Sequence, residues 1–264
     1  MKSHIQQAWE YRSHIWKDNR KSVLEQSYPE VVNRHIHNLH VEEIEHAIQK
    51  KYRVCLDVGC GYGRIAQELV ARNKGIFIHG VDLSRTFVTL FNQKLGGRGK
   101  AVVSDMRSLP YKANTFDYIY VVTAFMYLSG IKDQRKAMRE IFRTLKPGGT
   151  ALFVEPNKFG VWIIRLGGIV PFIYRRLLKR KKTETFGISF PWGRIDTLIE
   201  QHGRIMDKRG YPMLTIMLLP SVLLGKILPD FVHKILDFCR SLDEQIRYSR
   251  FSYVITYRAV KSSR

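Results

Sequence analysis

The sequence predicts an α/β fold, in which a mostly parallel sheet carries helices on both faces. The first observation is the segment 54–63, V-C-L-D-V-G-C-G-Y-G, where an apolar run ends in glycines at alternate positions and a helical pattern follows. A buried strand, a tight loop and a helix are the structure expected of such a segment. The second observation is that strand and helix patterns alternate from there to about residue 156. Alternation of this kind is typical of a parallel sheet.

Each element is predicted from its own pattern. Short apolar runs bounded by turn residues predict strands at 54–59, 76–82, 101–105, 116–124, 150–155, 204–208 and 252–259. Helical periodicity predicts helices at about 63–73, 84–95, 131–145 and 190–202. The third of these helices should stop at Lys146-Pro147-Gly148-Gly149, because a basic last turn followed by proline and glycine ends a helix.

Two further regions flank or interrupt this alternation. Residues 1–50 are predicted to form a helical cap of two or three helices, broken near Ser27-Tyr28-Pro29. Residues 51–264 are predicted to form one domain with two insertions, at about 157–190 and 213–250. We expect both insertions to act as helical lids, because segments that follow the fifth strand lie near the ligand-binding edge of such a sheet.

The charge of the chain is strongly positive. The net charge is +21 and the sequence pI is about 10.0, so nucleic acid, anionic lipid and acidic substrates are all candidate partners.

The three cysteines, Cys55, Cys60 and Cys239, are too few and too scattered for a disulfide framework or a zinc site. The sequence contains no signal-peptide core and no run of about 20 apolar residues, so a cytoplasmic protein is expected. Peripheral attachment to the inner face of a membrane stays open.

The glycine loop predicts a site for a small ligand. Glycine at every second position lets the backbone approach a ligand closely, and the N–H groups at the start of the next helix point toward it. A dinucleotide is disfavoured, because position 64 is Arg where the dinucleotide fingerprint needs Gly or Ala. Three acids also accompany the loop: Asp57 lies inside the first strand, and Asp82 and Asp105 end the second and third strands.

In these features the chain resembles the class I S-adenosylmethionine-dependent methyltransferases, in particular the type 11-like group that acts on small molecules and lipids. The resemblance covers roughly residues 50–156. It rests on the segments L-D-V-G-C-G-Y-G-R (56–64), G-V-D-L-S (80–84), S-D-M-R-S-L-P-Y (104–111), F-D-Y-I-Y (116–120) and L-K-P-G-G-T-A-L-F-V-E-P (145–156). It implies a Rossmann-like, seven-stranded sheet whose last strand is antiparallel, with 252–259 as that strand. It also implies methyl transfer with S-adenosyl-L-methionine as cofactor.

By this resemblance, the methionine part of the cofactor is assigned to the loop residues Gly59, Cys60, Gly61 and Gly63. Asp57 would order the loop and bind the cofactor's amino group. An acid buried in an otherwise apolar strand is costly unless it has a function, which favours this role. Thr123, which follows the fourth strand, would face the same end of the cofactor.

The nucleoside part is assigned, again by resemblance, to the ends of the next two strands. Asp82 would hold the ribose hydroxyls, with Leu83 against the adenine. Asp82 is also a candidate cap for the helix that follows, but Ser84 is an equally good cap and leaves the acid available. Asp105 and Met106 would bound the adenine from the other side, and Asp105 is alternatively a turn residue.

Four further polar residues have competing interpretations. Arg64 could pair with a carboxylate of the cofactor or of the substrate, or be an arginine on the helix surface. His35, His37 and His40 suggest a metal site, but no single helical face holds all three and no acid or cysteine completes the set. A solvated helix without a metal is therefore expected in this region.

The catalytic residues are not predicted. An activated methyl group requires mainly that the enzyme align a nucleophile and exclude water, and a base is needed only if the acceptor must lose a proton. Tyr11, Tyr127 and several histidines near the N-terminus are candidates, and nothing in their spacing selects one.

The acceptor is expected to be a small or lipid-like molecule, methylated on oxygen, nitrogen or carbon. The fourth strand is followed by V-T-A-F-M, and not by the Asn/Asp-Pro-Pro-aromatic motif of enzymes that methylate the amino groups of bases. The apolar stretch 161–174 and the basic residues from Arg175 to Lys182 suggest contact with an anionic membrane, and solvated lid helices are the alternative. An RNA- or protein-directed enzyme that docks through its basic C-terminal third, or a non-catalytic cofactor-binding subunit, also stays open. The oligomeric state is not predicted.

Overall fold

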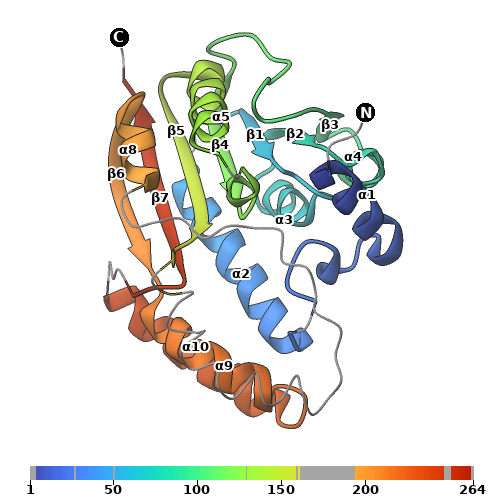
Figure 1. The fold of residues 1–264 in the computed structure, drawn as a ribbon, viewed down its shortest axis with the longest axis vertical. Helices are drawn as coiled ribbons and strands as arrows, with labels where there is room; N and C mark the ends of the chain where they lie inside the picture. Colours follow the sequence, from blue (N-terminus) through green and yellow to red (C-terminus); the bar gives the residue numbers. More distant parts are fainter. Residues whose placement is uncertain are drawn as a thin grey trace.

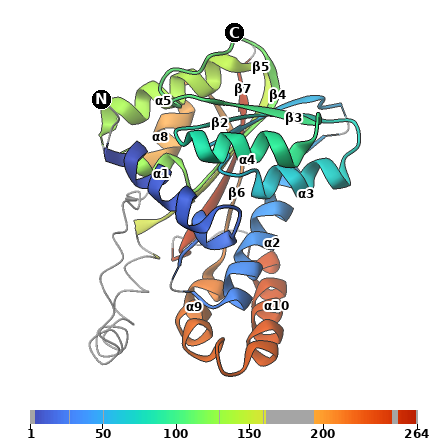
Figure 2. The same ribbon diagram turned by 90° about the vertical axis from the view of Figure 1, so that its right-hand side faces the viewer.

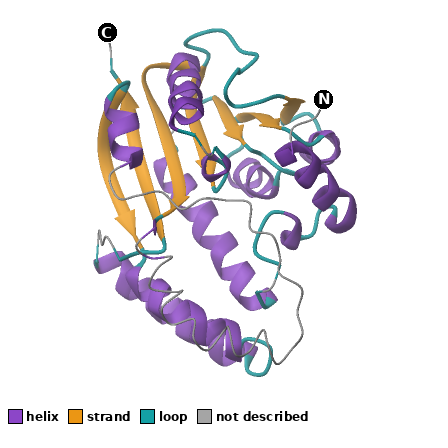
Figure 3. Cartoon of the chain, viewed as in Figure 1, coloured by secondary structure: helices purple, strands orange, loops and turns teal. Residues whose placement is uncertain are grey.

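The chain forms a single seven-stranded sheet with helices on both faces (Figures 1 and 3). The structure is a computed structural model. It describes residues 4–158 apart from 27, 50 and 129, together with residue 160, residues 194–246 and residues 251–262.

The strands of the sheet have the order β3-β2-β1-β4-β5-β7-β6. Their bounds are β1 Val54–Val58, β2 Phe77–Asp82, β3 Gly99–Val103, β4 Phe116–Val122, β5 Leu145–Pro156, β6 Gly203–Gly210 and β7 Val254–Lys261. Strands β1 to β5 pair in parallel, whereas β7 runs antiparallel to both of its neighbours, β5 and β6. The predicted sheet, with its antiparallel last strand, is confirmed.

Strand β4 shows why both faces of the sheet need helices. Its side chains alternate, so Ile119 and Val121 lie in one core and Tyr118 and Tyr120 lie in the other. The first core is closed by α5 (Ile131–Thr144) and α8 (Arg194–Glu200). The second is closed by α2 (Glu30–Ala47), α3 (Arg64–Arg72) and α4 (Arg85–Leu95), and Figure 2 shows α3 and α4 against that face. A strand that is buried on both faces has a nearly continuous apolar sequence, and β4 has such a sequence.

The N-terminal cap consists of α1 (His4–Trp16), a 3-10 turn η1 (Arg20–Ser22) and α2. Helix α1 packs along α4, where the Ser84 hydroxyl donates to the Ser13 hydroxyl at 3.0 Å and Thr86 donates to Glu10 at 2.9 Å. A second 3-10 turn, η2 (Phe125–Tyr127), follows β4. Helix α2 begins at Glu30, directly after the predicted break near Ser27-Tyr28-Pro29.

The expectation of a solvated second helix is wrong, because α2 is among the most buried helices. His35, His37 and His40 are buried, and His40 is only 1% exposed. The helix lies between α3 on one side and the pair α9 (Pro212–Leu224) and α10 (Pro229–Gln245) on the other. The sequence pattern concealed this burial because histidines occupy positions that face neighbouring helices.

Helices α9 and α10 form an antiparallel hairpin against α2 (Figure 1). Their shared core includes Leu214 and Leu218 of α9, Val232 and Leu236 of α10, and Leu39 of α2. The second predicted insertion is therefore a helical pair that extends the cap.

The first predicted insertion, at about 157–190, falls almost entirely outside the described residues, as does the apolar and basic segment 161–182. In the described part of the chain, no helix is long and apolar enough to span a bilayer.

Candidate cofactor and acceptor site

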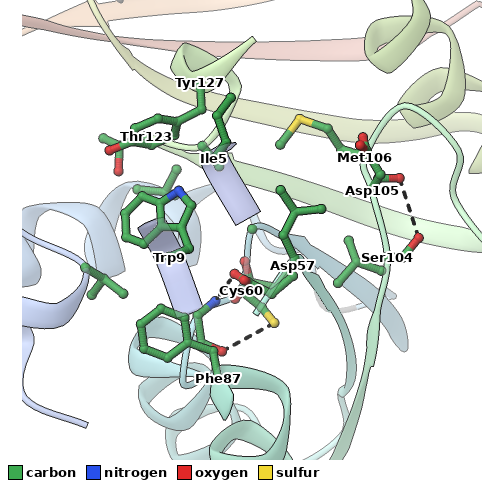
Figure 4. A pocket seen from close by; sticks show the side chains of 18 of the residues that line it. Ile5, Trp9, Asp57, Cys60, Phe87, Ser104, Asp105, Met106, Thr123 and Tyr127 are labelled. Atoms are coloured by element: carbon green, nitrogen blue, oxygen red, sulfur yellow. Dashed lines mark hydrogen bonds between the residues drawn. The ribbon is translucent and has the colours of Figure 1, made fainter. Parts of the chain in front are cut away.

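A cavity of about 210 Å³ lies at the carboxyl ends of β1, β2 and β4 (Figure 4). This is the point where the strand order reverses, since β2 continues from β1 in one direction and β4 in the other. Open α/β sheets bind their ligands at such a point. Nine of the ten predicted site residues line the cavity: Asp57, Gly59, Cys60, Gly61, Asp82, Leu83, Asp105, Met106 and Thr123.

The tenth predicted residue, Gly63, is not part of the lining and has a structural role. It begins α3 with a φ of +81°, and a Cβ there would lie 2.9 Å from the Phe91 ring. Gly59 is constrained in a similar way, with a φ of +78° and a hypothetical Cβ only 2.4 Å from the Ala124 side chain. The glycine loop is thus fixed partly by packing and partly by the positive φ that glycine adopts at little cost.

The Asp57 carboxyl group is buried at the floor of the cavity, and its residue is only 3% exposed. Burial raises its pKa to about 7, and the Tyr120 hydroxyl and the positive charge of Arg64 oppose this shift. A cationic group placed beside Asp57 would favour its ionised form. The residue is therefore suited to bind an ammonium group.

The Asp82 carboxylate holds the glycine loop next to the end of β2. One oxygen accepts the Gly61 N–H at 2.9 Å, and the other accepts the Ser84 N–H at 2.9 Å. Burial raises the pKa of Asp82 to about 6, against the effect of these hydrogen bonds. Of the two candidate caps, Ser84 is the N-cap of α4, because its hydroxyl accepts the Phe87 N–H. Each Asp82 oxygen still has a lone pair for a ligand hydroxyl.

Asp105 is tied to Arg107 on the opposite side of the cavity. The Arg107 guanidinium donates to Asp105 at 2.6 Å and to Asp133 at 2.7 Å, so that it bridges the end of β3 and the start of α5. Burial alone would raise the pKa of Asp105, but the hydrogen bonds from Arg107 outweigh it and lower the pKa. Met106 lies next to this bridge and packs partly against the sheet core. The sequence did not predict a role for Arg107.

Arg64 is buried in the cavity wall, so a role on the helix surface is excluded. Its guanidinium donates to His37 Nδ1 at 2.6 Å and to His40 Nδ1 at 3.2 Å. Because arginine can only donate, both imidazoles accept at Nδ1 and carry their proton on Nε2. Burial and the neighbouring Arg64 charge lower the pKa of His37 to about 3 and that of His40 well below its ordinary value. The two histidines are neutral acceptors that orient a buried cation.

We expect His37 and His40 to stay neutral throughout the range from pH 5 to 8. The measurement is the NMR of imidazole ring carbons during a pH titration, with free imidazole in the same tube as a reference. Their signals should not move, because protonation at Nδ1 would place a second positive charge against Arg64. A titration of either ring within this range would contradict the proposed hydrogen bonds.

An apolar and aromatic wall closes the other half of the cavity. Trp9 of α1 meets Tyr127 edge-on with ring centroids 5.0 Å apart, and it lies 6.4 Å from the Phe87 ring. Ile5 and Val23 complete the contribution of the N-terminal cap. Figure 4 shows this wall facing the polar residues Ser104 and Asp105 and the thioether of Met106. The residues of α1 were missed, because only their aromatic composition, without a spacing rule, marked them in the sequence.

Among the described residues, the second insertion contributes nothing to the cavity lining, since α9 and α10 pack on α2.

Tyr127, one of the open candidates for a base, does line the cavity, whereas Tyr11 is 68% exposed and does not. Burial raises the pKa of Tyr127 to about 12, so its hydroxyl keeps its proton at neutral pH and can donate a hydrogen bond.

A buried acid accepts hydrogen bonds from the loop that follows β4. Glu155, at the end of β5, accepts the backbone N–H groups of Ala124, Phe125 and Met126 at 2.9 to 3.2 Å. Burial raises its pKa to about 8, and the three hydrogen bonds oppose the shift. This anchor fixes Thr123, which has a φ of +49° and whose N–H donates to the Val154 carbonyl. Glu155 therefore positions the turn that carries Tyr127.

Replacing Glu155 with Gln should lower the free energy of unfolding by about 1–3 kcal/mol. The amide has one acceptor oxygen where the carboxyl group has two, so at least one backbone N–H in the turn loses its partner. The measurement is urea unfolding, with Glu200→Gln on the exposed face of α8 as the matched control. Equal midpoints for the two variants would show that Glu155 does not support the turn.

Comparison with known proteins agrees with this geometry. Residues 56–153 match the protein family described as "Methyltransferase domain". A sterol 4-C-methyltransferase of Caenorhabditis elegans is 32% identical over 100 residues, which are 36% of this chain and 28% of that protein. Phosphoethanolamine N-methyltransferase 2 of the same organism is 31% identical over 113 residues, 41% of this chain and 25% of that protein. The chain thus matches only about a quarter of the length of each of these relatives.

The fold also matches solved structures. The N-methyltransferase NodS of Bradyrhizobium japonicum, solved with S-adenosyl-L-homocysteine, aligns with a TM-score of 0.59 over 98% of this chain and 99% of that one, at 14% identity. At this identity the likeness concerns the fold alone. The sequence match covers residues 56–153, a range that includes the glycine loop and the acids Asp57, Asp82 and Asp105. The sequence match therefore identifies residues 56–153 as a methyltransferase domain of the S-adenosylmethionine-dependent, type 11 kind, and the order of the sheet agrees with the class I fold.

Proposed function

We propose that this protein transfers a methyl group from S-adenosyl-L-methionine to a small, lipid-like acceptor. The observation that supports it best is the division of one cavity into two chemically different halves. One half is made of the glycine loop and the carboxylates of Asp57 and Asp82, and the other is the wall of Trp9, Phe87 and Tyr127. Such a cavity suits a polar, positively charged donor beside an apolar acceptor.

The polar half fits each charged part of the cofactor. Asp57 would bind the ammonium group, because its carboxyl group is buried at the floor of the cavity and burial raises its pKa to about 7 in spite of the Arg64 charge. Asp82 would accept the ribose hydroxyls with its remaining lone pairs. Arg64 would bind the carboxylate, since its guanidinium has five N–H donors and two neutral histidines occupy only part of them.

The apolar half would select the acceptor and exclude water. When bound, the cofactor supplies a methyl group on a sulfonium cation, which a nucleophile attacks in line. The residues of the chain then need to hold the acceptor in one orientation, and orientation of this kind supplies a large part of the rate enhancement. Tyr127 could hydrogen-bond an acceptor heteroatom, although its high pKa makes it a poor proton acceptor at neutral pH. The name of one relative, a sterol 4-C-methyltransferase, is compatible with a lipid-like acceptor, whereas that of the other, a phosphoethanolamine N-methyltransferase, points to a small polar one.

The test is incubation with methyl-labelled cofactor and a cell extract, followed by separation into lipids, small polar metabolites, RNA and protein. Label in the lipid fraction that disappears with Trp9→Ala, while cofactor binding is retained, is the expected result. Label in RNA or protein would replace this proposal with the alternative of a macromolecular acceptor, which the net charge of +21 would favour. Cofactor binding without any labelled product would favour a non-catalytic subunit.

A further inference from the structure

We infer that the turn between α9 and α10 is a docking site for an anionic phospholipid membrane. This turn lies at the end of the molecule away from the sheet, next to the start of α2 (Figure 2). Within residues 224–231 it exposes four large apolar side chains: Leu224 at 37%, Ile227 at 75%, Leu228 at 48% and Phe231 at 52%. We call these four residues the apolar tip. The inference rests on the proposed function, because a lipid-like acceptor would explain why the protein binds a membrane. The experiment that tests it does not depend on the acceptor.

Helix α9 supports an apolar partner for this region. Its sequence, P-M-L-T-I-M-L-L-P-S-V-L-L, contains no charged residue. Leu214 and Leu218 face inward, yet Ile216 on the other side is 60% exposed. A helix that is apolar all round is normally buried in a core or in lipid, and exposed apolar patches mark interaction surfaces.

The charges around the tip identify the partner. Lys226 and Lys234 are exposed next to it, and Arg34 is exposed one turn beyond Val31, which touches the end of α9. Within the described ranges none of these three cations has an ion pair, and Asp230 is the one unpaired anion between them. An apolar surface ringed by cations is typical of proteins that bind at the interface of anionic membranes.

Other partners fit this surface less well. In a two-fold dimer each patch meets its own copy, which would bring the three cations of both subunits together. RNA binding would need aromatic platforms on which bases can stack, whereas three of the four tip residues are aliphatic. An anionic bilayer satisfies both the apolar tip and its ring of cations.

The tip is also connected to the cofactor cavity. The chain that leads from α1 into the first turn of α2 approaches both places: Val23 lies in the cavity lining, and Pro29 and Val31 lie against Gly225 at the end of α9. A Cβ on Gly61 would come within 3.0 Å of the Val23 side chain. A membrane at the tip would therefore lie close to the chain segment that covers the glycine loop.

The experiment is co-sedimentation of the full chain with phosphatidylcholine vesicles that do or do not contain phosphatidylglycerol. We expect binding to the anionic vesicles only, and a loss of at least about tenfold in Ile227→Ser/Phe231→Ser. Lys226→Gln/Lys234→Gln should weaken binding and reduce its salt dependence. The matched control, Ile15→Ser/Met206→Ser, removes two apolar side chains that are 52% and 45% exposed elsewhere and should bind as the parent does.

Three results would overturn the inference. The first is an absence of vesicle binding by the parent chain. The second is unchanged binding by the tip variant, which would place the membrane contact elsewhere. The third is a dimer in sedimentation velocity that the tip variant abolishes, without vesicle binding, which would make the tip a self-association surface. Titration with S-adenosyl-L-homocysteine verifies that each variant is folded. It also separates a failure of the docking site from a failure of the proposed methyl transfer.

Discussion

Replacing Arg64 with Met is expected to weaken the binding of S-adenosyl-L-homocysteine by at least about a hundredfold. Two charge-assisted hydrogen bonds to a carboxylate in a buried site contribute about 1.5–3 kcal/mol each, and every 1.4 kcal/mol changes the dissociation constant tenfold. The geometry supports this size, because Arg64 is buried and already oriented by His37 and His40. A pre-oriented donor loses little entropy when the ligand binds. Isothermal titration calorimetry measures the change.

A truncated ligand separates binding from folding in this variant. Methylthioadenosine has the same nucleoside but no carboxylate, so its affinity should change less than about threefold if the fold is intact. Arg72→Met is the matched control on the same helix, because Arg72 pairs on the surface with Glu45 and Glu68. Equal losses for both ligands would show that Arg64 supports the fold and does not bind the carboxylate.

The second expected result is that S-adenosyl-L-homocysteine binds more weakly as the pH falls below about 7. The pKa of Asp57 in the free protein is about 7, and an ammonium ligand prefers the ionised carboxylate. Below that pH the residue must release a proton before it can pair. The dissociation constant should therefore rise about five- to tenfold between pH 7 and pH 6, and more steeply below the Asp82 pKa of about 6. Calorimetry from pH 5.5 to 7.5 measures this slope.

Asp57→Asn should remove the dependence between pH 6 and 7 and weaken binding at pH 7.5 by about ten- to a hundredfold, because a neutral amide pairs weakly with an ammonium group. Methylthioadenosine lacks that group, so its binding should not vary between pH 6.5 and 7.5. If the asparagine variant keeps the slope of the parent, the titrating group is another residue and the assignment of Asp57 is wrong.

The sequence by itself determined the class of fold and most of the polar half of the cavity. Alternation of strands and helices is a local property, because each strand buries both faces and each helix buries one. The strand-end acids could be recognised for the same reason. The carboxyl ends of neighbouring parallel strands meet at one edge, so Asp57, Asp82 and Asp105 converge wherever such a sheet forms.

Only the tertiary structure decided what surrounds that polar half. Trp9 reaches the cavity because α1 packs on α4, and His37 and His40 meet Arg64 because α2 crosses α3. These contacts join residues from 24 to 118 positions apart, and no local pattern encodes them. Histidine in particular is ambiguous in sequence, since burial and hydrogen bonding decide whether it is a surface cation or a neutral acceptor. The placement of helices against the sheet therefore gave the cavity its apolar wall and gave Arg64 its partners.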